Sequence, residues 1–476
     1  MWPPKGFLYN GLAHLPTIAL VMMAMIFIYE IIYQGTGADP VLSPDSAVFQ
    51  SLATNQSAFD PPFWSGNRPA GLPLLMKILG HETRNLISFQ VLFHLVIWLS
   101  FSLWVFYRSL NKYFGLLCAG VIMLMASSPE ITLWNYHVLS ESVSLSLVPI
   151  IGVIIYEIIF KNNSRLIWIL LGGLFAFSMI RDANAYFVLT MVAPVWGIYL
   201  AKGLSKTQFA AAMIIIGLAF GVSTWSIANS RDSWGQERWF FSFLNITGQR
   251  ILVDEAILDQ FQSLGMPVNE ALLGKKGFWG SSDSWSFYQD PELSEFREWV
   301  AQNGKSVYAR FLIMHPGYSF SEFQTNKNLI FHADKYYLEI YEPEGFDFSN
   351  LNLATLVPNQ WVYLFLIVAA ALVYCIPKFL RRGWNNLKFR PAVNCLLMAL
   401  STLMPIGALF FISNHGDAME VSRHTLTAVV LLKAWLVIVF FEAGNSAFKT
   451  KITNFPVEDS ELMNLLIDDT KTLPRN

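Results

Sequence analysis

Four polar segments between long apolar stretches hold the residues of this chain that could do chemistry. They lie at 39–68, 137–141, 181–184 and 415–423, and each holds a charged pair or a histidine beside a carboxylate. Carboxylates beside arginines could take a proton from a hydroxyl and hold a phosphate by forked hydrogen bonds. The alternative is that each charged residue caps a helix end at a membrane surface. Because burying such groups costs several kcal/mol, their presence in all four segments favours a polar cavity on one side of a membrane.

The composition is that of a polytopic membrane protein. Of 476 residues, 54% are hydrophobic and only 14% are charged, and the mean hydropathy is +0.42. An ordinary soluble domain carries roughly 25% charged residues. The composition therefore excludes a soluble enzyme, a disordered protein and a nucleic-acid binder. The net charge is -2, and the three cysteines show no spacing typical of a disulfide framework or a structural zinc site.

Ten apolar stretches could cross a membrane, since a bilayer core needs about 20 mostly apolar residues per helix. The sequence thus predicts an all-α polytopic membrane protein with about ten transmembrane helices. The predicted spans are 12–33, 86–107, 114–128, 136–160, 165–180, 185–201, 207–228, 360–378, 393–413 and 423–442.

The basic residues predict the orientation of these spans. With the N-terminus inside, the short outer segments carry only Arg68, Lys77, Arg84 and Arg181. The short inner segments carry Lys5, Arg108, Lys112, Lys161, Arg165, Lys202, Lys206, Lys378, Arg381, Arg382, Lys388 and Arg390. Because cytoplasmic loops are enriched in lysine and arginine, we expect both termini in the cytoplasm and the polar segments outside.

This orientation divides the chain into four parts. Residues 1–228 form an N-terminal transmembrane bundle with a long first outer loop, 34–85. Residues 229–357 form a small, mostly helical extracytoplasmic domain, 358–442 add the last spans, and 443–476 form a cytoplasmic tail. Helical spacing marks the domain from Leu293 to Phe311, and a helix is predicted from Asp254 to Leu264.

The first outer loop is the most informative segment. Ser43-Pro44-Asp45-Ser46 predicts a helix start, where Asp45 or Ser43 could cap the first amides. Asp60 precedes Pro61-Pro62-Phe63-Trp64, and Trp64 could stack on a sugar or belong to an interfacial aromatic belt. The run from Arg68 to Leu75 is too short to span a membrane, and it predicts an amphipathic helix at the interface.

Four motifs resemble those of the GT-C superfamily, polytopic glycosyltransferases that use polyprenyl-phosphate-linked sugars. The first is a long outer loop with an early Asp45 before a short helix, followed by Arg68-Pro69-Ala70-Gly71-Leu72-Pro73-Leu74-Leu75. The others are Leu139-Ser140-Glu141-Ser142, Arg181 at the outer end of a span, and Glu420-x-x-Arg423-His424. Many members have Arg-Tyr where this chain has Arg423-His424. The resemblance covers 1–228 and 358–442, and not the extracytoplasmic domain.

The resemblance implies a GT-C-like bundle in a bacterial inner membrane, with an active site that faces the periplasm. It implies a polyprenyl-phosphate sugar as donor and a glycan or glycolipid acceptor such as O-antigen. Asp45 would be the catalytic base, with Asp60 as the alternative, and Arg423, Arg68 or Arg181 would bind the donor phosphate. The further substrate-binding candidates are Glu141, His137, Trp64, His415, Asp417 and Glu420.

A single displacement at such a site would invert the anomeric centre. The chain shows no nucleotide-binding loop and no DxD-type pair, so we expect no cofactor and a metal-independent step, although His415 and Asp417 leave a divalent metal open. A transporter or flippase of lipid-linked saccharide is the alternative function, and a non-catalytic scaffold is a third. Lys433, near the centre of the last span, has no explanation in the sequence.

Overall fold

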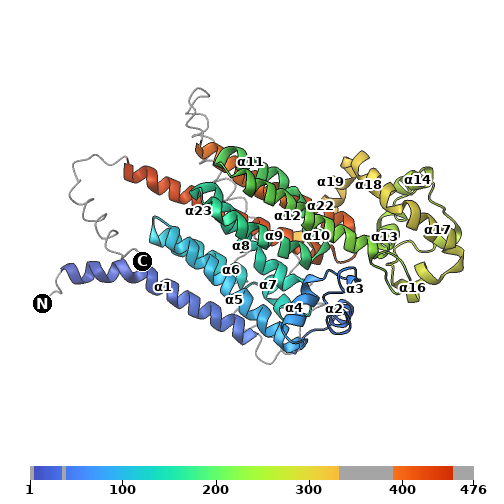
Figure 1. Ribbon diagram of the computed structural model, residues 1–476, viewed down its shortest axis with the longest axis horizontal. Coiled ribbons are helices and arrows are strands. Elements are labelled where there is room, and N and C mark those ends of the chain that lie inside the picture. The colour runs from blue at the N-terminus through green and yellow to red at the C-terminus, as the bar shows by residue number, and fades with distance from the viewer. Residues whose placement is uncertain (1–4, 35–38, 332–389, 454–476) are drawn as a thin grey trace, which may run out of the picture.

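The computed structural model describes residues 5–34, 39–331 and 390–453. All regular elements of this part of the chain are helices, and its only β-type pairing is an isolated bridge between Val41 and His137. Figure 1 shows a bundle of long helices with a smaller helical domain at one end. We call that end of the bundle the outer end and residues 230–331 the outer domain.

Seven helical stretches are long and apolar enough to cross a membrane, so the protein is a multi-pass membrane protein. They lie within α1 (Lys5–Gln34), α5 (Thr83–Arg108), α8 (Glu141–Lys161), α10 and α11 (Asp182–Thr190 and Val192–Lys202), α12 (Lys206–Asn229), α22 (Arg390–Gly416) and α23 (Val421–Thr453). An eighth would combine α6 (Lys112–Ala126) with α7 (Pro129–Thr132) and the turn Leu133–Tyr136, which are bent by 56°.

The prediction of about ten spans is therefore confirmed only in part. The range 360–378 lies outside the described residues. The range 165–180 forms α9 (Ile167–Ile180), whose 14 residues reach about 21 Å, less than the roughly 30 Å thickness of a bilayer core. The range 114–128 is the first half of the bent pair and not a complete span.

The bend between α6 and α7 accounts for Lys433. Pro129, the first residue of α7, has no N–H to donate to the preceding turn, so α6 ends before it. The bend places Glu130 inside the bundle, where the ammonium group of Lys433 forms an ion pair with its carboxylate. Two charges that would each be costly in the membrane therefore neutralise each other.

The first outer loop folds into three short helices, α2 (Pro44–Asn55), α3 (Pro61–Trp64) and α4 (Gly71–Ile78). Phe49 and Ala53 of α2 and Leu72 and Met76 of α4 are buried in the same apolar core as the spans. This packing fixes the loop on the outer end of the bundle (Figure 1).

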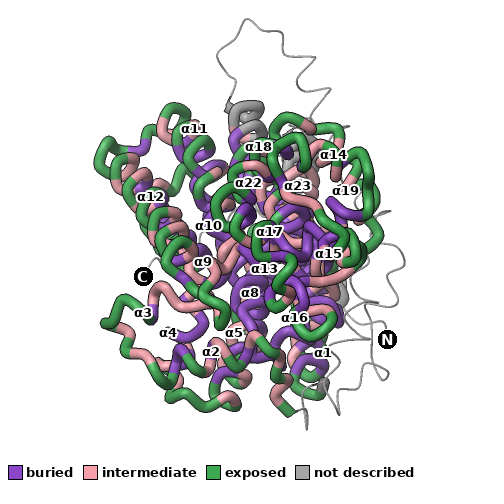
Figure 2. Tube along the Cα trace, turned by 90° about the vertical axis from the view of Figure 1, so that its right-hand side faces the viewer, coloured by how far each residue is buried: buried purple, intermediate pink, exposed green. Residues whose placement is uncertain are grey.

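The outer domain has an apolar core of its own. Its helices are α13 (Arg238–Ile246), α14 (Glu255–Ser263), α15 (Glu270–Leu273), α16 (Ser282–Gln289), α17 (Ser294–Trp299), α18 (Lys305–Met314) and α19 (Pro316–Phe331). Phe240, Phe261, Phe287 and Phe296 are among its buried residues. The helix predicted after Asp254 is confirmed as α14, which Asp254 caps at the amides of Ala256 and Ile257. Figure 2 shows buried segments behind the exposed loops of this domain.

Candidate functional site

Six of the predicted site residues meet at the outer end of the bundle. We call this set the charged cluster, and it consists of Asp45, Arg68, Glu141, Arg181, Glu420 and Arg423. They come from α2, the segment before α4, the start of α8, the break between α9 and α10, and the start of α23. Three carboxylates face three guanidinium groups, so the charges balance within the cluster.

Arg423 lies at the centre of the charged cluster and contacts a different carboxylate with each of its three nitrogens. Its Nε donates to Glu141 at 2.6 Å, its Nη1 to Glu420 at 2.8 Å and its Nη2 to Asp45 at 3.2 Å. Arg423 is 7% exposed and Glu141 is 1% exposed. Because the guanidinium fork is rigid, these three contacts fix its orientation.

Asp45 is held by two arginines. Its Oδ1 accepts a hydrogen bond from Arg68 and its Oδ2 one from Arg423. The carboxylate therefore does not act as the helix cap that the sequence left open, and the amide of Ser43 instead donates to the side chain of Ser46. Burial by itself would raise the pKa of Asp45, but Arg68 and Arg423 outweigh burial and lower this pKa to about 2.

One N–H donor of Arg68 has no hydrogen-bond acceptor among the described residues. Its Nη2 binds Asp45, whereas its Nε is buried and has no hydrogen-bond partner among the described residues. A buried guanidinium N–H without an acceptor costs free energy. The Nε of Arg68 is therefore a donor that an anion bound in the charged cluster could use.

Arg181 closes the cluster on the side of α9. It lies in extended conformation between α9 and α10, and its Nη2 is 3.5 Å from Glu141. The same nitrogen is 3.2 Å from Nδ1 of His424. His424, which the resemblance marked only as a departure from the family, thus contacts a predicted phosphate-binding arginine. The only indication of this contact in the sequence is that His424 directly follows Arg423.

Asp60 and Trp64 lie apart from these contacts. Asp60 is exposed at the N-cap position of α3, and no ion pair with it is found in the part of the chain that the structure describes. Trp64 donates its indole N–H to the carbonyl of Ala58 at 2.9 Å. Of the two aspartates predicted as candidates, the structure therefore places Asp45 in the charged cluster and Asp60 outside it.

His137 is buried near the charged cluster and interacts electrostatically with Glu141 and Arg423. Its Nδ1 lies 3.0 Å from the carbonyl oxygen of Leu133. Burial lowers the pKa of His137 to about 4, so the ring is neutral at neutral pH. Since the bridge to Val41 fixes its backbone, His137 helps to hold the segment before α2 against the start of α8.

His415 and Asp417 face the outer domain instead of the charged cluster. Asp417 accepts hydrogen bonds from Ser242 at 2.8 Å, Asn245 at 2.9 Å and the amide of Met419 at 2.8 Å. The ring of His415 lies 4.9 Å from that of Phe411. Within the described ranges, no group of three or more His, Cys, Asp or Glu side chains is placed to hold a metal ion.

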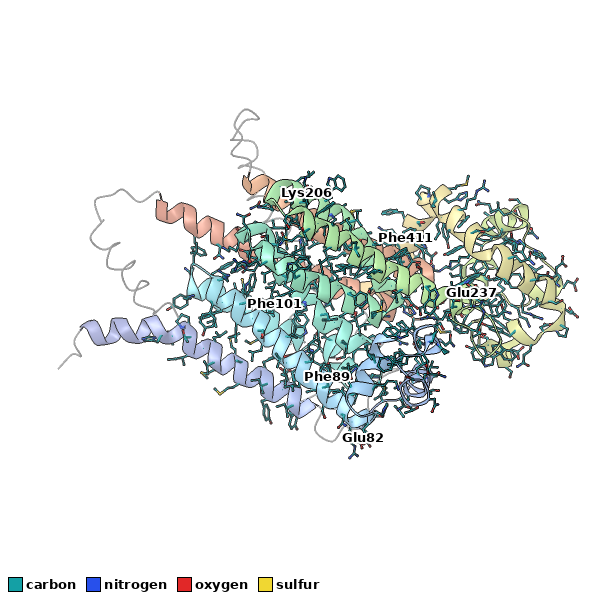
Figure 3. The ribbon with its side chains drawn as sticks, in the orientation of Figure 1. Glu82, Phe89, Phe101, Lys206, Glu237 and Phe411 are labelled. Carbon is teal, nitrogen blue, oxygen red and sulfur yellow. The ribbon has the colours of Figure 1, made fainter. Side chains whose placement is uncertain are left out.

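An ion pair outside the charged cluster links the outer domain to the spans. Arg238, the first residue of α13, contacts both carboxylate oxygens of Asp182 at 3.1 and 2.9 Å. Of the adjacent residues Arg181 and Asp182, the first therefore contacts the charged cluster and the second contacts α13. Figure 3 labels Glu237, the residue before α13, where the outer domain meets the bundle. Sequence reasoning missed this pair because its partners are 56 residues apart.

The geometry as a whole can bind an anion through arginines and hold a carboxylate beside it. These residues and their contacts carry the functional argument. Comparison with models of known protein families finds no match, and comparison with the sequences of curated proteins finds none either.

Proposed function

We propose that this protein is a membrane glycosyltransferase of GT-C type that transfers a sugar from a polyprenyl phosphate to a glycan or glycolipid outside the membrane. The observation that carries the proposal is the position of Asp45 between Arg68 and Arg423 at the outer end of the spans. The proposed setting is a bacterial inner membrane, with O-antigen or another envelope polysaccharide as the kind of acceptor.

The arginines supply the phosphate site. A lipid-linked donor enters from the outer leaflet with its phosphate at headgroup depth, which matches the place of the cluster at the helix ends. Arg68 has a free Nε for a phosphate oxygen, and Arg423 is oriented by Glu141 and Glu420. Guanidinium groups held in this way stabilise the charge that develops on a leaving phosphate.

Asp45 supplies the base. The acceptor oxygen forms a bond to the anomeric carbon while its proton passes to Asp45. The bond between that carbon and the phosphate oxygen breaks, and polyprenyl phosphate leaves with the electron pair. One displacement of this kind inverts the anomeric centre.

A carboxylate with a pKa of about 2 is a weak base, and the same two arginines resolve this difficulty. When the donor phosphate takes hydrogen bonds from Arg68 and Arg423, both guanidinium groups share their charge between phosphate and Asp45. The pKa of Asp45 then rises. As the leaving phosphate gains negative charge, this effect strengthens at the moment at which the proton is transferred.

The ion pair of Glu130 and Lys433 favours a second candidate, a transporter or flippase of lipid-linked saccharide. Transporters place acidic and basic pairs near the middle of the membrane, where they bind coupling ions or substrate. A flippase would bind the same donor without cleaving it, so turnover separates the two functions.

The experiment offers radiolabelled sugars on short polyprenyl phosphates to the purified protein in detergent and follows the release of sugar to water or to a glycan extract. We expect turnover of one donor by the wild type, its loss in Asp45→Asn, and its retention in Asp60→Asn. The second variant is a matched control because Asp60 lies in the same loop, exposed and outside the cluster. Binding of a donor without turnover would contradict the glycosyltransferase and favour the flippase.

A further inference from the structure

Two tryptophans lie exposed next to each other on the outer domain. Trp234 is 41% exposed and Trp285 is 40% exposed, and their ring centroids are 6.4 Å apart. By contrast, Trp299 of the same domain is 9% exposed. We call Trp234, Trp285 and the adjoining Tyr288 the aromatic platform.

The rings of the aromatic platform are held in place by contacts with each other and with Asp232. Trp234 stacks on Tyr288 with centroids 5.3 Å apart, and the hydroxyl of buried Tyr288 donates to Asp232 at 3.1 Å. The other carboxylate oxygen of Asp232 accepts the amides of Trp234 and Gln236. Because these rings are already ordered, a ligand that stacks on them loses little additional side-chain entropy.

The backbone that presents Trp285 is strained. Asp283, Ser284 and Trp285 have φ angles of +49°, +52° and +67°, in the left-handed region that non-glycine residues avoid. Each such residue costs about 1–2 kcal/mol. Strain of this kind persists where the surrounding structure imposes it, and it clusters at ligand sites. Here the packing of Trp285 on Phe241, with centroids 5.6 Å apart, helps to impose it.

The surroundings of the aromatic platform favour a neutral sugar over a lipid headgroup. Asp232 and Asp283 are close to the two tryptophans in the chain. The basic residues nearest to these segments already have partners. Arg231 pairs with Glu237 at 3.9 Å and Lys275 with Asp290 at 3.3 Å, and Arg297 donates to the carbonyls of Phe287 and Asp290. Acidic side chains repel anionic lipid headgroups and accept hydrogen bonds from sugar hydroxyls. In the described part of the chain, the indole N–H groups of Trp234 and Trp285 have no hydrogen-bond acceptor, so both remain available to a ligand. The negative faces of the rings attract the C–H face of a sugar.

We propose that the aromatic platform is the subsite that binds the acceptor glycan. This inference rests on the proposed function, and it names an uncharged saccharide as the ligand of the outer domain. Figures 1 and 2 both place α16, which carries Trp285, on the side of the outer domain that lies over α1 and α2, away from α11 and α12. Because α2 carries Asp45, the aromatic platform and the helix of the proposed base lie toward the same side of the molecule.

Saturation-transfer NMR on the purified full-length protein tests the subsite with neutral tetrasaccharides of glucose, galactose, mannose or rhamnose. The variants are Trp234→Leu and Trp285→Leu, which keep apolar packing against Tyr288 and Phe241 but remove the ring faces. The control is Phe320→Leu, an aromatic that is 66% exposed on α19. We expect the wild type and the control to bind at least one tetrasaccharide, and each tryptophan variant to bind it at least about tenfold more weakly, a loss of 1.4 kcal/mol.

Donor hydrolysis without acceptor, measured on the same samples, reports whether the charged cluster remains intact and is expected to be unchanged. Equal binding by the tryptophan variants, or no binding by the wild type, would overturn the subsite. Unchanged saccharide binding with a loss of activity only in bilayers would also overturn it and assign the pair to the membrane surface. Loss of saccharide binding in the variants of a protein that hydrolyses no donor would support the subsite and contradict the proposed function.

Discussion

Asp45 and its two arginines explain why the cluster is more than a set of helix caps. A cap binds backbone amides, whereas both oxygens of Asp45 bind side chains from segments 23 and 378 residues away in the chain. Glu141 likewise lies in the first turn of α8 but uses its carboxylate on Arg423 and Arg181. The helix-start patterns predicted the places of these residues, while tertiary contacts decide what their carboxylates do.

Glu141 is expected to be the residue whose loss destabilises the protein most. In Glu141→Gln, three guanidinium groups face only two carboxylates, and Arg423 keeps a neutral acceptor but loses the negative charge 2.6 Å from its Nε inside the protein. Breaking a buried ion pair costs about 3–5 kcal/mol because the remaining charge stays buried. We therefore predict a clear decrease in the thermal unfolding midpoint in detergent.

The control for this prediction is Glu82→Gln, which changes an exposed carboxylate at the start of α5 and is expected to leave the midpoint unchanged. Adding Arg181→Gln to Glu141→Gln rebalances the charges and should recover part of the stability. An unfolding midpoint of Glu141→Gln equal to that of the wild type would contradict a buried role for this carboxylate.

The sequence predicted most of the charged cluster but not its pairing. Asp45, Arg68, Glu141, Arg181, Glu420 and Arg423 stand at ends of apolar stretches, and any alternation of spans brings such ends to one side. The same criterion, a position near the end of an apolar stretch, also selected residues that lie outside the charged cluster: Asp60, Trp64, His415 and Asp417. Their side chains are placed by the conformation of the first outer loop and by the packing of the outer domain. The partner of Lys433 could not be predicted, because Glu130 enters the bundle only through the bend after α6.

At the scale of elements, the turn between α22 and α23 connects the outer domain to the charged cluster. Asp417 binds α13 through Ser242 and Asn245, and Ala418 is buried in the core of the outer domain. Glu420, with a left-handed φ of +50°, then directs the chain into α23, where Arg423 begins its contacts. Only six positions separate Asp417 from Arg423 in the chain, so we expect the contacts of Asp417 with the outer domain to help position Arg423.

Asp417→Ala is expected to weaken this connection and slow donor turnover. The variant loses the acceptor of three hydrogen bonds, so the segment that presents Glu420 and Arg423 is less firmly held. We predict a loss of at least about tenfold, the value of one hydrogen bond to a charged group, in the rate of donor hydrolysis. Asp417→Asn should retain most of the rate, because an amide oxygen can still accept from Asn245 and Met419. Equal rates for Asp417→Ala and the wild type would show that the turn does not position Arg423.

In the whole molecule, most charged side chains of the described spans lie at helix ends or are covered by other parts of the protein. The chain has many exposed apolar residues along α1, α5 and α12, as expected for surfaces that face lipid. The described ion pairs within the bundle lie at the outer end, at the bend after α6 and at Glu157, a buried residue that contacts the half-exposed Arg108 at 3.0 Å. The outer domain, which α13 and α19 attach to the bundle, adds the aromatic platform outside the spans.

Hydropathy predicted the class of fold well because the bilayer imposes length and apolarity on each span. It predicted the number of spans less well, since α9 is short and α6 is interrupted at Pro129. The arrangement of the outer domain could not be predicted, because its helices are short and their packing depends on one another. Composition alone did not distinguish the exposed Trp234 and Trp285 from the buried Trp299.

In the proposed mechanism, Arg68 and Arg423 bind Asp45 in the free protein and the donor phosphate in the complex. The most direct test is equilibrium binding of farnesyl phosphate to the purified wild type, Asp45→Asn and Arg68→Ala, with farnesol as the phosphate-free control. Removing the competing carboxylate should tighten binding by about tenfold, or 1.4 kcal/mol, and Arg68→Ala should weaken it, with farnesol unaffected. Binding to Asp45→Asn that is equal to or weaker than binding to the wild type would contradict the account.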